Sequence, residues 1–368
     1  MRRSLQAVSR SSWRRVSVDL HARPRLTVES LPLDDPRWST FVASQPSASV
    51  FQLPSWSRVL VDTYGYRAFA LVAEDRDGIS AGTTVFEIRR PFGGRRWISV
   101  PFADHAEPVG SADGIEAIVE ALHEESGAGV VSAVEFHADV GGPSRAVGTR
   151  HVLRLDDDPD AVFARFKKTQ VRQPIAKAER ERTVVATVRL DREAVVETFF
   201  RLHVATRRRL GVPVQPRSFF EHLWRETIAA GHGFTVVAEA HGHPVAAAVF
   251  LSAGRDVTYK FSASDSRSWS LRPNNVVLWT AIKHGCERGF EMFDFGRTEL
   301  GNEGLRAFKS GWGGEELGLR YTTFGAHATL NDEGTSPHLV ASAARAVIRR
   351  SPSLVGRAVG QALYRYAA

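Results

Sequence analysis

Cysteine is almost absent from this sequence: Cys286 is the only one among 368 residues. A single thiol cannot form a disulfide within the chain, so the fold does not depend on oxidation, as is usual in a reducing compartment. Cys286 falls in a helix predicted over residues 276–288, where a structural thiol is commoner than a nucleophile. Long apolar runs are missing too, since no stretch approaches the ~20 residues needed to cross a bilayer.

The arginine-rich N-terminus lacks the continuous apolar segment of a signal peptide. We therefore expect a cytoplasmic protein. Acidic residues are missing from both ends of the chain. Residues 1–18 and 334–368 each contain five arginines and no acid, so each end carries +5 of the total charge of +7, and the body between them carries −3. This distribution does not favour a DNA partner, whereas the basic ends suit the anionic inner face of a membrane.

Several catalytic signatures are also absent, namely the Walker P-loop, the Rossmann glycine fingerprint, His-Glu-x-x-His, Cys-x-x-Cys and Gly-x-Ser-x-Gly. The thirteen histidines are scattered, and only His241 and His243 are close together, in a predicted hairpin turn. We expect no metal and no bound cofactor.

Strands and helices alternate along the chain, which predicts an α/β (α+β) fold. A predicted hairpin over residues 69–89 has a counterpart over residues 234–251. Their Val-Ala-Glu triplets are 165 residues apart, and Phe86 and Phe250 are 164 apart. The same order of elements surrounds both hairpins. The sequence therefore predicts a tandem duplication of one unit, each a mixed sheet flanked by helices.

The predicted domain organisation has four parts. Residues 1–25 form a flexible basic arm, 26–155 a first domain, 156–330 a second domain and 331–368 a basic amphipathic tail. The tail is either a packed terminal helix or a helix lying on a membrane surface. In the second domain, a basic helix over residues 160–182 is expected to kink or split at Pro174. A helix over residues 193–210 ends at Gly211, which suits the C′ position.

The most informative stretch is a strand over residues 293–295, the turn at Gly296 and Arg297, and a short helix with Arg306 and Lys309. A spacing of three places both cations on one helix face. This pattern is typical of an anion-binding wall and also of an ordinary solvated surface.

A second candidate runs from Lys260 through Arg272, Asn274 and Asn275 into a long apolar helix. Asparagine is a good N-cap, and free amides at a helix N-terminus bind phosphate. Simple capping explains the same residues, and no glycine opens this loop for a pyrophosphate. A third candidate is the loop over residues 101–108, where Asp104 and His105 are possible general bases or ordinary solvated charges.

With these pieces in place, the chain resembles the Fem-type branch of the GNAT-fold acyltransferases, and within it the FemAB-like proteins found near exopolysaccharide loci. The resemblance covers roughly residues 45–325. The matching stretches follow one another in the family's order: residues 101–105, the basic helix with Arg172 and residues 175–180, and then residues 206–213, 272–276, 293–296 and 308–313.

The resemblance implies tandem GNAT-like domains with the acceptor site in the cleft of the first. Founding members of the family transfer an amino acid from aminoacyl-tRNA to an amine of a peptidoglycan precursor without a metal, and relatives use acyl-CoA. It also implies that Phe308 and Lys309 line the reaction centre. Trp312 stands where phenylalanine is commoner, and Pro174 is a departure within the basic helix.

The sequence thus favours an acyltransferase acting on a cell-envelope or polysaccharide precursor, at the inner face of the membrane. In the mechanism that this resemblance leads us to expect, Lys309 stabilises the carbonyl oxygen, Arg306 or Arg297 binds phosphate, and Asp104, His105 or a substrate phosphate takes the proton. One alternative is an acyl-CoA-dependent N-acyltransferase. Another is a non-catalytic binding protein of an envelope assembly. The donor, aminoacyl-tRNA or acyl-CoA, stays open.

Overall fold

The computed structural model describes residues 16–18, 26–89, 94–129, 131–325 and 364. The chain divides into two compact units. The first comprises residues 1–57, 66–143 and 322–329, and the second comprises residues 58–65, 144–321 and 330–368. Of the expected basic arm, Val16–Val18 form strand β1, which pairs with β2 (Leu26–Leu31). The rest of that arm, and the tail except Tyr364, lie outside the described residues.

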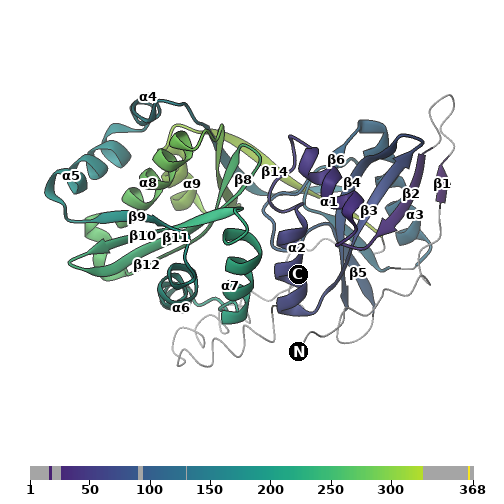
Figure 1. The fold of residues 1–368 in the computed structure, drawn as a ribbon, viewed down its shortest axis with the longest axis horizontal. Coiled ribbons are helices and arrows are strands. Elements are labelled where there is room, and N and C mark those ends of the chain that lie inside the picture. Colours follow the sequence, from purple (N-terminus) through teal and green to yellow (C-terminus); the bar gives the residue numbers. More distant parts are fainter. Residues whose placement is uncertain (1–15, 19–25, 90–93, 130, 326–363, 365–368) are drawn as a thin grey trace. The chain divides into compact units, whose positions relative to one another are not determined.

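The first unit contains a mixed sheet whose strands follow the order β1-β2-β3-β4-β5-β7 (Figure 1). Its neighbouring strands are antiparallel except for β5 and β7, which run parallel. Helix α3 packs on β2, β3 and β4, and the Ser111 hydroxyl caps it by accepting from the Gly114 amide. Its remaining elements are β3 (Arg67–Asp75), β4 (Gly78–Arg89), β5 (Arg95–Ile98), β6 (Val109–Gly110), β7 (Ala133–Phe136), α1 (Pro36–Ser44), the start of α2 (Pro54–Tyr64) and α3 (Ala112–Gly127).

The second unit repeats this plan with strand order β8-β13-β12-β11-β10-β9, in which only β12 and β13 run parallel. Helices α8 and α9 lie on one face of its sheet, and α6 and α7 lie on the other (Figure 1). The strands are β8 (Ser144–Arg154), β9 (Val185–Arg189), β10 (Gly233–Ala240), β11 (His243–Ala253), β12 (Asp256–Ser264), β13 (Met292–Glu299) and β14 (Glu315–Phe324); the helices are α4 (Pro159–Ala164), α5 (Gln173–Glu181), α6 (Phe200–Leu210), α7 (Arg217–Leu223), α8 (Pro273–Glu287) and α9 (Glu303–Ser310).

Strands β8 and β14 are neighbours in the sheet. Strand β8 was expected to close the first domain, but it lies in the second unit because it pairs with β13. Strand β14 lies beside β8, and its last residues, Thr322–Phe324, pair with β7 in the first unit.

The predicted duplication is visible in the register of the two hairpins. Ala73 pairs with Ala81 in β3–β4, and Ala238 pairs with Ala246 in β10–β11. An offset of 165 therefore holds on both strands, and each hairpin has its bulge at the same place, directly after Ala73 and Ala238. The same offset makes Val85, not Phe86, the counterpart of Phe250, which corrects the predicted alignment by one residue.

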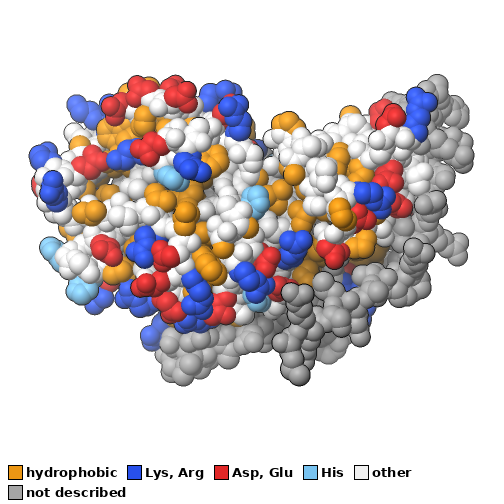
Figure 2. Space-filling view, viewed as in Figure 1, with side chains coloured by type: hydrophobic (Ala, Val, Ile, Leu, Met, Phe, Trp, Pro, Cys, Tyr) orange, Lys and Arg blue, Asp and Glu red, His pale blue; other side chains and the backbone are white. Residues whose placement is uncertain are grey.

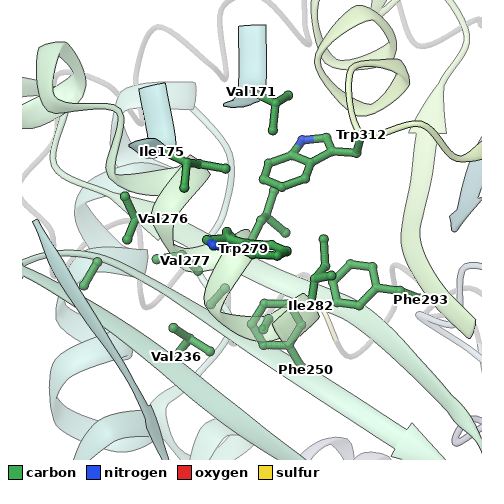
Figure 3. Packing of buried hydrophobic residues seen from close by; sticks show 14 of the residues in the cluster. Val171, Ile175, Val236, Phe250, Val276, Val277, Trp279, Ile282, Phe293 and Trp312 are labelled. Atoms are coloured by element: carbon green, nitrogen blue, oxygen red, sulfur yellow. The ribbon is translucent and has the colours of Figure 1, made fainter. Parts of the chain in front are cut away.

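Aromatic side chains fill the core of the second unit. Figure 3 shows Phe250, Trp279, Phe293 and Trp312 within this cluster. Trp312 is fully buried, and its ring centroid lies 5.1 Å from that of Phe166. The mixed sheets and flanking helices confirm the predicted α/β fold.

Helix boundaries differ from the prediction in two places. The predicted basic helix is divided: Lys167 is extended, Lys168–Arg172 form a π-helical turn, and α5 follows directly, with Pro174 in its first turn. Helix α8 begins at Pro273, so neither Asn274 nor Asn275 is its N-cap. Gly211, by contrast, ends α6 with a φ of 71°, as predicted.

Candidate functional site

The candidate site is built around a bulge in β13 of the second unit. Strand β13 pairs with β8 at Asp294 and again at Arg297, so Phe295 and Gly296 form an irregularity opposite His151. Gly296 adopts a φ of 70°, which favours glycine. Its amide donates to Asp294 Oδ1 at 2.7 Å, and Arg150 Nη1 donates to Asp294 Oδ2 at 3.0 Å. The local sequence thus makes its own bulge, a feature often found beside active sites.

Lys309 reaches this bulge from α9. Its side chain is buried, and Nζ donates to the carbonyl oxygens of Gly296 at 2.7 Å and Arg297 at 3.0 Å. A buried ammonium is costly unless dipoles or charges compensate it. The bulge supplies two such carbonyl dipoles, one from Gly296 within the irregularity and one from Arg297, where the pairing with β8 resumes. The structure therefore places a fixed positive charge inside the second unit.

The two predicted phosphate-binding arginines are each occupied by neighbours. Arg306 Nε lies 2.9 Å and 3.0 Å from the two carboxylate oxygens of Glu316, in a half-exposed ion pair. Arg297 Nη1 donates to the Tyr321 hydroxyl at 3.3 Å, and its guanidinium carbon lies 5.5 Å from the centre of that ring. Lys309 and Arg306 share a helix, but one is buried on carbonyls and the other is paired with an acid.

Sequence reasoning missed His151, which lies beside this cluster. Its side chain is fully buried, and Nε2 lies 3.4 Å from Glu316 Oε2. Neither ring nitrogen makes a hydrogen bond to a described residue. Burial lowers the pKa of the imidazole, against the opposing charge of Glu316, while Lys309 lowers it further. The sequence did contain a signal for this residue. His151 is a titratable residue at a buried position of a strand whose other buried residues are apolar, and Arg150 precedes it.

Phe308, Trp312 and Lys260 take different roles. Phe308 packs against the second-unit core, and its ring centroid lies 6.2 Å from that of the fully buried Trp312. Trp312 is thus a core residue, not a surface on which a substrate lies. Lys260 places its Nζ 5.6 Å from the centre of the Phe261 ring, on β12.

The stretch before α8 is a 3₁₀ turn, Ser266–Leu271, closed by Arg272 in the left-handed region with a φ of 53°. Arg272 is exposed and Asn274 half-buried. Asn275 is buried and donates from its side-chain nitrogen to the Gln170 carbonyl at 3.2 Å. That bond joins the start of α8 to the π-helical turn, and it commits Asn275 to packing.

Asp104 and His105 lie in the first unit, in the loop that follows β5. Both are half-buried, and His105 Nε2 lies 2.9 Å from Glu107 Oε1. Phe102, two residues before Asp104, has a φ of 60°, a strained conformation for an aromatic residue and one that clusters at functional sites. Asp104 belongs to the first unit and Lys309 to the second.

Two absences concern only the described part of the chain. No helix there is long and apolar enough to cross a membrane. Within the same residues, no three or more His, Cys, Asp or Glu side chains are grouped to hold a metal ion. Figure 2 shows Lys and Arg interspersed with Asp and Glu over the face of the second unit in view, without a continuous basic field.

Comparison with known proteins supports this architecture. The family model described as "Acetyltransferase (GNAT) domain" matches residues 165–310, which lie in the second unit. The crystal structure of FemX is similar over 82% of this chain and 98% of its own, with a TM-score of 0.65 and 16% identity. No curated protein matches.

Two further solved structures are similar. L-PGS from Bacillus licheniformis matches 87% of this chain and 99% of its own, with a TM-score of 0.53 and 15% identity. The C-terminal domain of a putative lysylphosphatidylglycerol synthetase from Agrobacterium fabrum matches 80% and 93%, with a TM-score of 0.54 and 15% identity. The chain therefore has the GNAT fold, and the segment of its second unit over residues 165–310 is similar to the acetyltransferase (GNAT) family model.

Proposed function

We propose that this GNAT-fold acyltransferase transfers an aminoacyl or other acyl group to an amine of a cell-envelope or polysaccharide precursor. The observation that carries the proposal is the buried ammonium of Lys309, held on the Gly296 bulge inside the segment that matches the GNAT family. The similarity to FemX and to lysylphosphatidylglycerol synthetase domains favours an aminoacyl donor and an envelope acceptor. A place near exopolysaccharide assembly rests on the sequence resemblance alone.

The proposed chemistry is aminolysis of an ester or thioester. The amine nitrogen bonds to the carbonyl carbon, negative charge grows on the carbonyl oxygen, and the bond to the leaving oxygen or sulfur breaks with its electron pair. A positioned cation such as Lys309 contributes ~3 kcal/mol at that oxygen, the scale measured for one oxyanion-hole donor. The proton lost by the amine passes to Asp104, His105 or a substrate phosphate, and the leaving group takes up a proton.

The donor is identified by thermal shift of the full chain. We expect stabilisation by aminoacyl-tRNA and none by acetyl-CoA, with uncharged tRNA and free CoA as the matched controls. Stabilisation by acetyl-CoA alone would establish the acyl-CoA-dependent alternative, which the family description favours and the glycine-free stretch of residues 265–276 disfavours. Stabilisation by neither donor would support the non-catalytic binding protein.

The role of Lys309 is tested with the donor that binds. We expect Lys309→Ala to lower the transfer rate by about a hundredfold, as loss of an oxyanion-hole donor does. Lys309→Arg keeps a positive charge but replaces the ammonium by a larger, planar guanidinium. The control is Lys283→Ala, which removes a lysine of α8 that pairs with Glu179 of α5. A loss well under tenfold in a folded Lys309→Ala variant would refute the assignment.

Peripheral binding to the inner face of a membrane is a separate part of the proposal, supported by the basic tail. Tyr364 within that tail bonds to the Pro213 carbonyl at 3.2 Å and to Arg207, so truncation also removes packing. The sharper variant replaces Arg345, Arg349 and Arg350 by glutamine and leaves Tyr364 in place. We expect weaker binding to vesicles containing anionic lipid and unchanged thermal stability. Unchanged vesicle binding would exclude the membrane part.

A further inference from the structure

His137, at the end of β7 in the first unit, holds the chain on both sides of Asp104 and His105. Its Nδ1 lies 3.1 Å from the Ala103 carbonyl oxygen, and because a carbonyl only accepts, Nδ1 carries the proton in this contact. Its own backbone carbonyl accepts from the Ala106 amide at 2.9 Å. Ala103 and Ala106 are both buried, whereas Asp104 and His105 between them are half-exposed. One residue therefore brackets the two proton acceptors predicted from sequence.

The ring of His137 is itself oriented. Its Nε2 lies 3.3 Å from Glu135 Oε1, and the other oxygen of that carboxylate lies 2.9 Å from Arg96 Nη2. Glu135 and His137 are each about nine-tenths buried, so these contacts are largely shielded from water. The contacts thus run in sequence from Arg96 on β5 to Glu135 on β7, and from Glu135 to His137. The ring of His137 in turn contacts Ala103 of the loop.

The loop is anchored at its start as well. The Ser99 amide donates to the Glu135 carbonyl at 2.8 Å, and the Ser99 hydroxyl accepts from the His137 amide at 3.0 Å. These bonds continue from the parallel β5–β7 pairing, which ends at Ile98 and Glu135. The left-handed Phe102 lies between this anchor and Ala103. A loop that contains such a strained residue persists only where its surroundings over-determine it, and His137 supplies part of that constraint.

We infer that His137 is a positioning residue that fixes Asp104 and His105 for proton removal, with Glu135 and Arg96 orienting its ring. The inference rests on the proposed function, in which one of these two residues takes the proton from the attacking amine. His137 itself lies beneath the loop and acts through it.

Three substitutions separate the two ring nitrogens. His137→Asn places an amide nitrogen where Nδ1 was, His137→Gln places one near Nε2, and His137→Ala removes both. Hydrogen exchange of peptides covering residues 101–108 reports the loop directly. We expect exchange in the alanine and glutamine variants to rise by about tenfold or more, and the asparagine variant to stay within about twofold of wild type, since only asparagine retains a donor to Ala103.

The control is His123→Ala on α3 of the same unit. His123 is exposed, and its ring stacks on that of Phe324 with the centroids 5.2 Å apart. We expect its loop peptides to exchange as in wild type. Unchanged exchange in a folded His137→Ala protein would overturn the inference.

A double-mutant cycle tests whether His137 acts through the loop acids and bases. In the transfer assay with the donor that binds, we expect His137→Ala to lower kcat by roughly tenfold to a hundredfold with KM within about twofold, as displacement of a catalytic group does. In the background of Asp104→Asn or His105→Gln, whichever lowers turnover more while leaving a measurable rate, the same change should add less than about twofold. Additive losses would mean that His137 only stabilises the fold, and the inference would fail.

The cycle also separates this inference from the proposed function. If Asp104→Asn and His105→Gln both keep full turnover, the assignment of proton removal to this loop is refuted and the positioning role falls with it. If either variant loses turnover while exchange and kcat are unchanged in His137→Ala, the proton-removal assignment stands and only the role of His137 is refuted.

Discussion

The ammonium of Lys309 and the carbonyl oxygen of Gly296 lie 2.7 Å apart, so a helix side chain completes a bulge in the strand that precedes it. The bulge and the cation depend on each other. The carbonyls of Gly296 and Arg297 accept from the cation, and the Lys309 side chain is buried there. Both residues belong to the stretch that the sequence had already singled out, which makes this relationship the natural starting point for mutagenesis.

Asp294 builds the bulge and is the first target. Asp294→Ala removes the acceptor for the Gly296 amide and the partner of Arg150, and we expect a loss of about 2 kcal/mol in the free energy of unfolding. Asp294→Asn keeps the acceptor and loses only the ion pair, so its loss should be smaller. Urea unfolding measures both, with Asp77→Ala, an exposed turn residue, as the control. Equal effects of alanine and asparagine would mean that the Gly296 bond contributes nothing.

Gly313 is fixed by its backbone and by its surroundings. Its φ is +74°, and an added Cβ would lie 2.8 Å from the Arg165 carbonyl oxygen. We expect Gly313→Ala to destabilise the protein by about 1–3 kcal/mol, because left-handed strain and a backbone clash add. Gly304 in α9 is the matched control, since a Cβ there meets nothing within 4 Å. Gly304→Ala should stabilise by ~0.5 kcal/mol. Thermal unfolding that ranks the two variants the other way round would contradict this account.

Substitution of Trp312 by phenylalanine, the commoner residue at this position in the family that the sequence resembles, tests the packing of the second-unit core. The indole nitrogen is buried and makes no hydrogen bond to a described residue, so phenylalanine loses volume but no polar contact. We expect Trp312→Phe to cost less than about 1.5 kcal/mol and Trp312→Ala about 3–5 kcal/mol. Denaturant midpoints of the two variants decide the matter. Similar losses for both would imply that the indole nitrogen has a role that the packing does not show.

His203 predicts a dependence of stability on pH. Its side chain is buried against Phe199 and Phe220, and burial, with the charge of Arg207, lowers its pKa to about 3. Below the ordinary pKa near 6.5 the unfolded chain binds a proton that the folded chain does not, so stability falls as the pH is lowered, by ~1.4 kcal/mol per unit for one such group. This loss is absent above about pH 7 and continues down to the folded pKa.

The test compares unfolding midpoints of wild type and His203→Phe between pH 7.5 and 5. Phenylalanine keeps the aromatic packing but cannot bind a proton, so the variant should lose less stability over this interval. His243→Ala, at the exposed start of β11, controls for removal of a surface histidine. A wild type and a His203→Phe variant with parallel pH curves would show that His203 is not responsible.

Much of the fold was predictable because the signals are local. Short apolar runs on either side of a polar turn located both central hairpins, and the shared Val-Ala-Glu triplet revealed the duplication that the 165-residue register confirms. Gly211 ended its helix as predicted, since a left-handed C′ residue is a matter of backbone sterics alone. Two short strands were not predicted, namely β9 at the edge of the sheet and β2 between β1 and β3. A short strand gives only a brief apolar pattern, and its pairing depends on strands elsewhere in the chain.

For the site residues too, local sequence determined some features and contacts between distant segments determined others. By itself, the sequence determined that Lys309 follows a strand, a glycine turn and an arginine, because residue spacing fixes what a short helix can present. Only the tertiary structure decided that Lys309 turns inward to Gly296, that Arg306 turns to Glu316, and that His151 joins them. Those outcomes depend on β8, β13 and β14 lying side by side, and burial then sorts the charges: a cation stays buried where carbonyls meet it and stays exposed where a carboxylate meets it in water.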